Sequence, residues 1–472
     1  MALKRLRFVQ RRRTVGYTQD ELAARLGVER TTVGRWEAGD TEPQPWQRPR
    51  IAEFLKVTLD ELDELLVAVT VVPDRGDGFT LVSSVPVDFS LSPSHTVQVM
   101  EGFSGHDLIS RRQVLAEMAL LTGPALVRPV RQWVADVPPI PLQPPYPVEP
   151  DEIEEVARAV QLFRRWDDSG AGGLRRKAVV GQLNAVTETL REQPPLAVQR
   201  RLFGIGAELA QLSGWMAYEQ GLYGLAQRYY LLALHACREA GATPFGARVI
   251  SCMAKLANAL GNYDDSLELV RAALCGLPRS GGEMVRSELL GVESRAYAEL
   301  GSRESANAIR AAEACVEVYG EGAAEPAPDW MYYFDAAEAD CLAANTYIEL
   351  ALKADDPGRA QRHAARAEQY TLRVRAGRPE PYARSRIFDE IHLAKVRLAQ
   401  GEPGESAAVG MRSVELAEGL RSASVLKWLV RFDAELDARH PRHPDVRQFH
   451  GRLLDYLRKA SPQRELHEPQ RD

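Results

Sequence analysis

Three polar side chains near the N-terminus have the types and the spacing needed to read DNA bases. Arg30, Thr31 and Arg35 follow the tight turn Gly27-Val28-Glu29 and fall on one side of a short helical segment. The planar fork of an arginine can donate two hydrogen bonds to O6 and N7 of guanine, which discriminates against other bases by roughly 1–3 kcal/mol. The pattern therefore predicts a helix that contacts base edges in a major groove.

Short helical segments within the first 66 residues would position these side chains. Five are predicted: Leu3–Arg13, Thr18–Leu26, Glu29–Ala38, Trp46–Leu55 and Leu59–Leu66. Thr18 followed by Glu21 is a capping box that starts the second segment, and Gly27 ends it. Val33 and Trp36 supply the apolar stripe of the third. Two helices joined by a tight turn form a helix-turn-helix, whose second helix enters the major groove.

This segment resembles the XRE (lambda-repressor-like) helix-turn-helix family over about residues 3–66. The residues that carry the resemblance are Thr18-Gln19, Leu22-Ala23, Gly27-Val28, Thr32-Val33, Trp36-Glu37 and Gly39. They combine the caps, the spacing and the core positions of that family.

The resemblance implies roles for the matching positions. Gln19, at the start of the second helix, would hold a DNA phosphate or a base edge, and Thr18 beside it is a further predicted DNA contact. Arg12 would pair with Glu37 as a structural ion pair. If that pair is buried, removal of one partner costs about 3–5 kcal/mol.

Other arginines of this segment are expected to contact phosphates, which adds affinity and salt dependence but carries no sequence information. They are Arg5, Arg11, Arg13 and Arg25. The alternative for them is a basic face that only contacts solvent.

The net charge of the whole chain, −6, argues against nucleic acid as a partner, but its distribution does not. The first 50 residues hold 11 basic and 6 acidic side chains, whereas the rest of the chain is acidic. A basic N-terminal segment on an acidic body is typical of a local phosphate-binding surface.

Composition divides the chain into four parts. Residues 1–68 form the predicted DNA-binding domain, and residues 69–150 a linker with one short helix at 110–121 and a Pro-rich stretch at 136–150. Because proline fixes φ and removes a donor, that stretch is expected to be extended. Residues 151–460 are predicted to be helical repeats, and 461–472 a disordered tail. The fold class is all-α: a five-helix helix-turn-helix domain, a Pro-rich linker and an α-solenoid.

Glycines in the long C-terminal part recur at a fixed distance. Gly221, Gly261 and Gly301 are 40 residues apart, and each lies between small residues seven positions before and five after. Small residues at these positions let two antiparallel helices pack closely, as in a tetratricopeptide repeat. Two weaker units follow, and Leu426–Leu436 and Val446–Leu457 are expected to close the array.

The order of these parts resembles a group of actinobacterial regulators of antibiotic production and development. In that group an XRE domain precedes a Pro-rich linker and tetratricopeptide-like repeats. The residues behind the resemblance include Ser110-Arg111-Arg112, Gly214-Trp215-Met216-Ala217 and Ala226-Gln227-Arg228-Tyr229-Tyr230. A more distant similarity is to the peptide-pheromone sensors of Gram-positive bacteria.

One position recurs on the concave face that such repeats form. In successive units it is Trp215, Lys255, Arg295, Asn345 and Lys395, with Tyr218 and Asn258 one helical turn further along two of these helices. This stripe predicts a basic, hydrogen-bonding groove for an anionic ligand such as a peptide carboxylate. The alternative is a solvated inner face whose charge is balanced by Glu208, Glu288 and Glu338.

Catalytic and metal-binding patterns do not emerge from the sequence. There is no GxxxxGK[ST] or GxSxG motif, and the pair His440 and His443 lacks a third ligand. No metal, no cofactor and no enzymatic activity are predicted. The five cysteines are at least 15 residues apart, which favours a reducing cytoplasm, and no apolar run is long enough to cross a membrane.

These patterns favour a sequence-specific regulator that binds double-stranded DNA as a homodimer. Its repeats would mediate dimerisation and receive a peptide, small-molecule or protein signal. The alternative is an interaction scaffold with a vestigial helix-turn-helix, which would bind operator DNA no better than random DNA.

Overall fold

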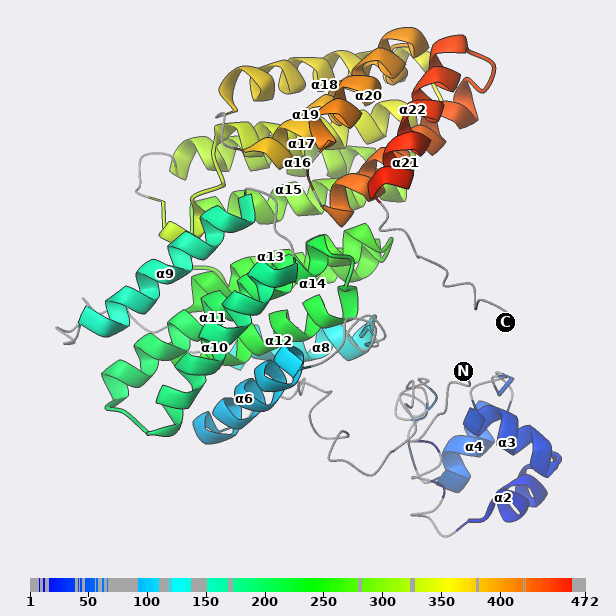
Figure 1. Ribbon diagram of the computed structural model, residues 1–472. Helices are drawn as coiled ribbons and strands as arrows, with labels where there is room; N and C mark the ends of the chain where they lie inside the picture. Colours follow the sequence, from blue (N-terminus) through cyan, green and yellow to red (C-terminus); the bar gives the residue numbers. More distant parts are fainter. Residues whose placement is uncertain are drawn as a thin grey trace, which may run out of the picture. The chain divides into compact units, whose positions relative to one another are not determined.

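The computed structural model is all-α in the part that it describes, and the chain divides into two compact units, residues 1–81 and 82–472 (Figure 1). The described residues are 8, 12, 17–38, 41, 43–44, 47–55, 57, 62, 66, 92–109, 118, 120–136, 151–168, 173–278, 282–322, 327–378, 382–418, 420 and 422–460.

The N-terminal unit contains α2 (Gln19–Leu26), α3 (Arg30–Ala38) and α4 (Arg48–Leu55). The predicted capping box is confirmed, because the Thr18 hydroxyl accepts from Glu21 N (3.2 Å) and the Glu21 carboxylate accepts from Thr18 N (2.7 Å). Gly27 ends α2 with φ 69°, a left-handed conformation that favours glycine. Leu22, Val33 and other apolar side chains of the three helices form one core. Of the first and fifth predicted segments, only single residues are described.

The second unit is a series of antiparallel helix pairs. After α9 (Asp151–Asp168) and α10 (Gly173–Arg191) come α11 (Leu196–Glu219) with α12 (Tyr223–Ala240), α13 (Thr243–Ala259) with α14 (Tyr263–Gly276), α15 (Glu283–Leu300) with α16 (Ser305–Gly322), α17 (Ala336–Leu352) with α18 (Pro357–Gly377), α19 (Ala383–Ala399) with α20 (Pro403–Ala417), and α21 (Ala423–Arg439) with α22 (Pro444–Ala460). Short 3₁₀ turns lie at Ser302–Glu304 and Asp329–Met331. The first helices of successive pairs pack against one another, so they form the inner layer. The closing helices predicted from the sequence correspond to α21 and α22.

Positive φ angles explain the glycine period. Gly221, Gly261, Gly301 and Gly401 have φ of 75°, 82°, 103° and 81°, and each lies in the turn between the two helices of a pair. A residue with a Cβ rarely adopts this conformation, so four pairs require glycine at the same place. The α17–α18 pair turns without a glycine, and Asp356 caps α18 by accepting from Arg359 N (2.6 Å).

Two helices lie where the sequence predicted a linker, and that prediction was wrong for them. The helices α6 (Pro93–Ile109) and α8 (Pro124–Asp136) belong to the second unit, where α6 packs on α10 and α8 on α14. The apolar residues of α6 are spread around the helix, so its sequence shows no amphipathic pattern. Those of α8 do lie on one side, at Leu126, Val127, Val130 and Trp133, but Pro129 within the segment argues against a helix. The helix predicted at 110–121 does not reach its expected end, because Met118, Leu120 and Leu121 are not helical. Residues 110–117, the Pro-rich stretch from 137 to 150 and the tail at 461–472 lie outside the described residues.

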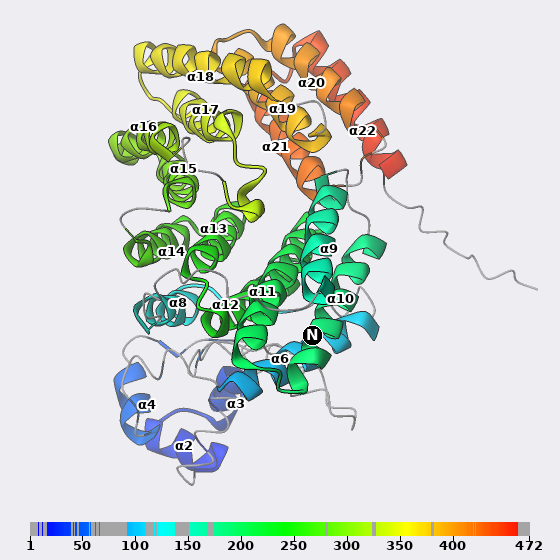
Figure 2. The ribbon, with the colours of Figure 1, turned by 90° about the vertical axis from the view of Figure 1, so that its left-hand side faces the viewer.

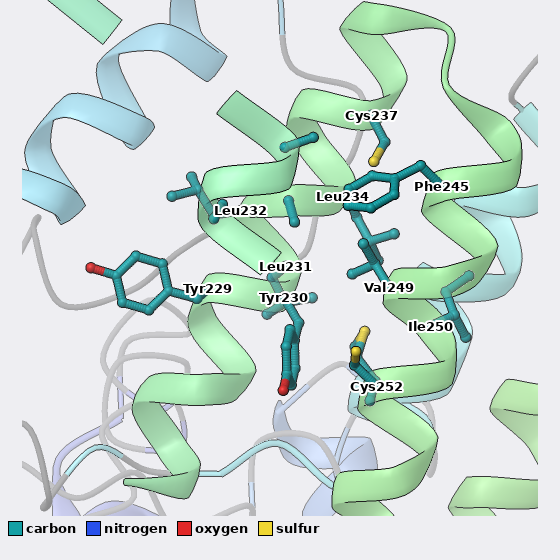
Figure 3. Close-up of a cluster of buried hydrophobic side chains, with 14 of the residues drawn as sticks. Tyr229, Tyr230, Leu231, Leu232, Leu234, Cys237, Phe245, Val249, Ile250 and Cys252 are labelled. Atoms are coloured by element: carbon teal, nitrogen blue, oxygen red, sulfur yellow. The ribbon is translucent and has the colours of Figure 1, made fainter. Parts of the chain in front are cut away.

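The contacts of α6 and α8 are specific. Asp107 of α6 forms a buried ion pair with Arg176 of α10 (Nη2 to Oδ1, 3.0 Å), and the Tyr229 hydroxyl donates to the same carboxylate. Trp133 of α8 is 2% exposed, and its Nε1 donates to Leu234 O (2.9 Å). Figure 3 shows the neighbouring core between α12 and α13. These helices are therefore part of the repeat core.

The Trp133 ring occupies space that a side chain at Gly246 would need. A Cβ at Gly246 would lie 2.0 Å from Trp133 Cη2. We expect Gly246→Ala to lower the free energy of unfolding of the repeat unit by about 1–3 kcal/mol. Urea denaturation measures this. The matched control is Gly181→Ala in α10, where an added Cβ would have no neighbour within 4 Å, and which should be neutral or slightly stabilising. Equal urea midpoints for the two variants would contradict the close packing of Trp133 against Gly246.

The array curves until its last pair meets its first (Figure 2). Ser422 and Ser424 of the α21 segment donate to the Glu219 carboxylate at the end of α11 (2.5 and 2.8 Å). Lys427 Nζ donates to Ala259 O (2.5 Å), and Arg431 pairs with Glu299 (2.8 Å). These contacts join residues more than 130 positions apart and close the inner face into a cavity.

Candidate nucleic-acid interface and repeat-domain cavity

The helix α3 has one buried and one exposed side. Val33 and Trp36 are buried in the core of the N-terminal unit, whereas Arg30, Thr31 and Arg35 are exposed. The Thr31 hydroxyl donates to Glu29 (3.2 Å). Because packing fixes the rotation of the helix, the predicted base-contacting side chains all lie on the surface.

The structure brings Arg12 and Glu37 together. Arg12 Nε donates to Glu37 Oε1 (2.5 Å), and the two side chains are only 6% and 7% exposed. The Gln19 amide donates to Glu37 Oε2 (2.5 Å). The Gln19 nitrogen is thus engaged inside the unit, where it links α2 to α3. The resemblance, by contrast, had implied that the Gln19 side chain contacts DNA.

The remaining predicted contacts of this unit are only partly described. The Thr18 hydroxyl takes part in the capping box, and Arg25 lies over the rings of Tyr17 (5.1 Å) and Phe54 (5.9 Å). The aromatic contacts of Arg25 give it a structural role within the unit. Arg11, like Arg5 and Arg13, lies outside the described residues.

The inner layer of the repeat unit encloses a cavity of about 280 Å³. Most of the predicted groove residues line it: Trp215, Tyr218, Lys255, Asn258, Arg295 and Asn345. They come from α11, α13, α15 and α17, so equivalent positions of successive repeats face one space.

Lys395 is the exception and corrects the prediction. It occupies the equivalent position in α19, but it is only 2% exposed and is not among the cavity-lining residues. Its amine pairs with Glu349 and with Glu435 of α21 (3.3 Å). Because α21 packs on α19, this lysine is covered.

A buried carboxylate holds two of the cavity cations. Glu288 is fully buried and accepts from Lys255 Nζ (2.6 Å) and from the Tyr333 hydroxyl (2.7 Å), with Arg248 Nε at 3.3 Å. Burial by itself raises the pKa of Glu288, but the two cations and the hydrogen bonds outweigh it and lower the pKa to about 2. Glu288 is therefore ionised at neutral pH.

The other predicted acidic residues are also paired. Glu208 accepts from Arg164 (2.7 Å), and Glu338 from Arg378 (3.0 Å). The balancing of cations by carboxylates, considered above as the alternative, is thus part of the structure. These ion pairs lie in or beside the wall of the cavity and do not fill it.

Several cavity residues were missed by sequence reasoning. Lys427, Trp428 and Arg431 come from α21, and Arg384 from α19. No signal in the repeat pattern marks them, because α21 reaches the cavity only through the curvature of the array. Arg248 could have been found, because it lies two helical turns before Lys255 on the same face of α13.

A group with metal-ligand chemistry also borders the cavity. Ligand atoms of Cys341, Asp389 and His392 lie within 4.8 Å of one another. Arg378, however, donates to both oxygens of Asp389 (2.9 and 3.1 Å). That ion pair already occupies the carboxylate that a cation would need, so the cluster is a continuation of the ion-pair network of the cavity wall.

Comparison with known proteins assigns the N-terminal unit. Residues 9–62 match the helix-turn-helix family, and no curated protein matches the chain. The match covers the capping box, the turn at Gly27 and α3. The N-terminal unit thus contains an XRE-type helix-turn-helix over the matched residues, which is a DNA-binding domain of transcription regulators. None of the described helices is long and apolar enough to span a membrane.

Proposed function

We propose that the protein is a sequence-specific transcription regulator that binds operator DNA through Arg30, Thr31 and Arg35. The observation that carries the proposal is the exposed side of α3 within a domain that matches the helix-turn-helix family. We further propose that Gln19 and Thr18, at the start of α2, contact the phosphate backbone. The same role is proposed for Arg11 from the sequence alone, because Arg11 lies outside the described residues.

The repeat unit has two roles in this proposal. It joins two chains into a homodimer, so that two recognition helices reach half-sites about 34–36 Å apart, or a multiple of this distance. It also binds a signal in its cavity, which shifts the placement of the two DNA-binding units. Sedimentation of the full chain tests the dimer. The order of domains supports a cytoplasmic regulator of secondary metabolism, and a genome-wide footprint in the native host would identify its targets.

Two single substitutions test the DNA-binding surface. We expect Arg30→Ala and Arg35→Ala each to weaken operator binding by about tenfold to a hundredfold, because each removes a contact worth roughly 1–3 kcal/mol. The thermal midpoint should not change, since both side chains are exposed. Gel shifts on operator and random DNA at several salt concentrations measure the specificity ratio and the number of phosphate contacts.

The control is Arg458→Ala, which removes the same charge from an exposed position in α22. It should bind like the wild-type chain. If all three variants bind like wild type, α3 is not the recognition helix. If the wild-type chain binds operator and random DNA equally, the interaction scaffold becomes the better explanation.

A further inference from the structure

The closure of the array limits what the cavity can hold. Contacts between α21 and the ends of α11 and α13 cross the inner face, so the stripe predicted as an open groove is enclosed on that side. A volume of about 280 Å³ suits a small molecule. Lys427 and Arg431 line the cavity and are also exposed to solvent, so a ligand can reach it beside α21.

Positive charge gathers where α21 meets the inner layer. Lys427 pairs with no carboxylate of the described residues, and its hydrogen-bond acceptor is the neutral carbonyl of Ala259. Burial is the main cause of the lowered pKa of Lys427, and the charges of Arg431 and Arg295 lower it further. These two neighbouring arginines add to a local excess of positive charge. An anionic group placed here would remove that excess.

Aromatic rings alternate with these cations. Arg295 lies 4.6 Å from the Trp428 ring centre, Arg384 5.8 Å from Trp215, and Lys427 5.3 Å from Tyr223. A guanidinium that stacks on a ring keeps its N–H groups in its own plane, where they can donate to a carboxylate or a phosphate. Rings and cations together favour a ligand that is flat and apolar on its faces and anionic at its edge.

Unpartnered acceptors border the same space. Asn258 donates to Val292 O (3.1 Å), but its buried Oδ1 has no hydrogen-bond partner, and neither does the buried Oδ1 of Asn345. An unpaired buried acceptor is destabilising, so N–H or O–H donors of a ligand would be stabilising here.

We propose that the cavity binds a small aromatic anion. Its ring packs against the aromatic wall formed by Trp215, Tyr223 and Trp428, and its carboxylate or phosphate lies by Lys427 and the neighbouring arginines. Its N–H or O–H groups donate to Asn258 and Asn345. This ligand would be the signal for the sensing role proposed above, and its regulatory meaning rests on that role. Binding of the ligand to the cavity can be measured without DNA.

Calorimetry and thermal shift on the full-length protein test the proposal. The probes are a set of aromatic carboxylates, including indole-3-carboxylate, and a set of nucleoside 5′-monophosphates, which distinguish the two sources of the anion. Uncharged indole and guanosine, inorganic phosphate, acetate and an acidic pentapeptide are the comparison ligands. We expect at least one aromatic anion to bind and to raise the thermal midpoint, and its uncharged or non-aromatic counterparts to bind at least about tenfold more weakly.

A pair of variants assigns the binding to the cavity. Lys427→Gln should weaken the bound aromatic anion by about tenfold. The matched control Lys459→Gln, at an exposed position in α22, should not change its affinity. The proposal is overturned if no aromatic anion binds, if only the peptide binds, if phosphate or acetate binds equally well, or if both variants keep wild-type affinity.

Operator gel shifts with and without the bound anion separate the two proposals. Calorimetric binding that depends on Lys427 supports the ligand assignment whatever the DNA result. If the anion binds but leaves operator affinity unchanged, the sensing role proposed for the repeat unit fails and the ligand assignment stands.

Discussion

Replacement of Glu37 by alanine is expected to destabilise the N-terminal unit by about 3–5 kcal/mol, because it leaves Arg12 buried without its counter-ion. The Gln19 amide loses its acceptor in the same step. A small domain has a total stability of only about 5–15 kcal/mol, so this loss should abolish most DNA binding at 37 °C. The repeat unit should remain folded, because it has its own core.

Hydrogen exchange resolves the two units of the full chain. Amides of α2 and α3 should lose protection in Glu37→Ala, while those of α13 and α15 keep it. The control is Glu53→Ala on the exposed side of α4. The double variant Arg12→Met with Glu37→Leu should recover most of the stability, because an apolar pair of similar volume can replace a buried ion pair. If Glu37→Ala exchanges no faster than Glu53→Ala, the pair has no structural role.

The second large effect is expected at Glu288. Its replacement by glutamine removes the negative charge that Arg248 and Lys255 share in the cavity wall, and we expect a loss of about 3–5 kcal/mol in the free energy of unfolding of the repeat unit. Glu317→Gln, at an exposed position in α16, is the matched control and should change stability by less than about 0.5 kcal/mol. Urea denaturation at pH 7 compares the two.

The low pKa of Glu288 predicts how this contribution depends on pH. Its folded-state pKa of about 2 lies below the ordinary value of 4.5, so the unfolded state takes up the proton first as the pH falls. The stabilisation is therefore complete above pH 4.5 and is lost between about pH 4.5 and 2. The shift corresponds to about 3 kcal/mol. Glu288→Gln should lack this part of the pH dependence, and curves that run parallel for wild type and variant from pH 7 to 3 would contradict it.

The DNA-binding unit could be predicted closely from the sequence, because its signals are local. The capping box at Thr18 and the left-handed Gly27 depend on residues at most four positions apart. The apolar spacing of Val33 and Trp36 then determines which side of α3 is exposed. The engagement of Gln19 by Glu37 and the contact of Arg25 with Phe54 required the structure, because each joins residues on two helices.

The cavity could be predicted in part. A period of 40 residues places Trp215, Lys255 and Arg295 at the same position of successive repeats, so the sequence predicts that they share a face. The 40-residue period does not, however, predict which other helices pack against that face. Lys395 obeys the same register but is covered by α21, so the register predicted its position and not its exposure.

The sequence by itself thus determined the all-α class, the glycine turns of the repeat pairs and the position that recurs on the inner layer, because each depends on a 3.6-residue or 40-residue period. Tertiary structure alone decided that α6 and α8 join the core and that α21 meets α11. Both depend on contacts between residues about 70 to 200 positions apart, such as Asp107 with Arg176, Trp133 with Leu234 and Ser422 with Glu219. The small rotation between neighbouring repeats adds up along the array, so its closure appears only when all the pairs are in place.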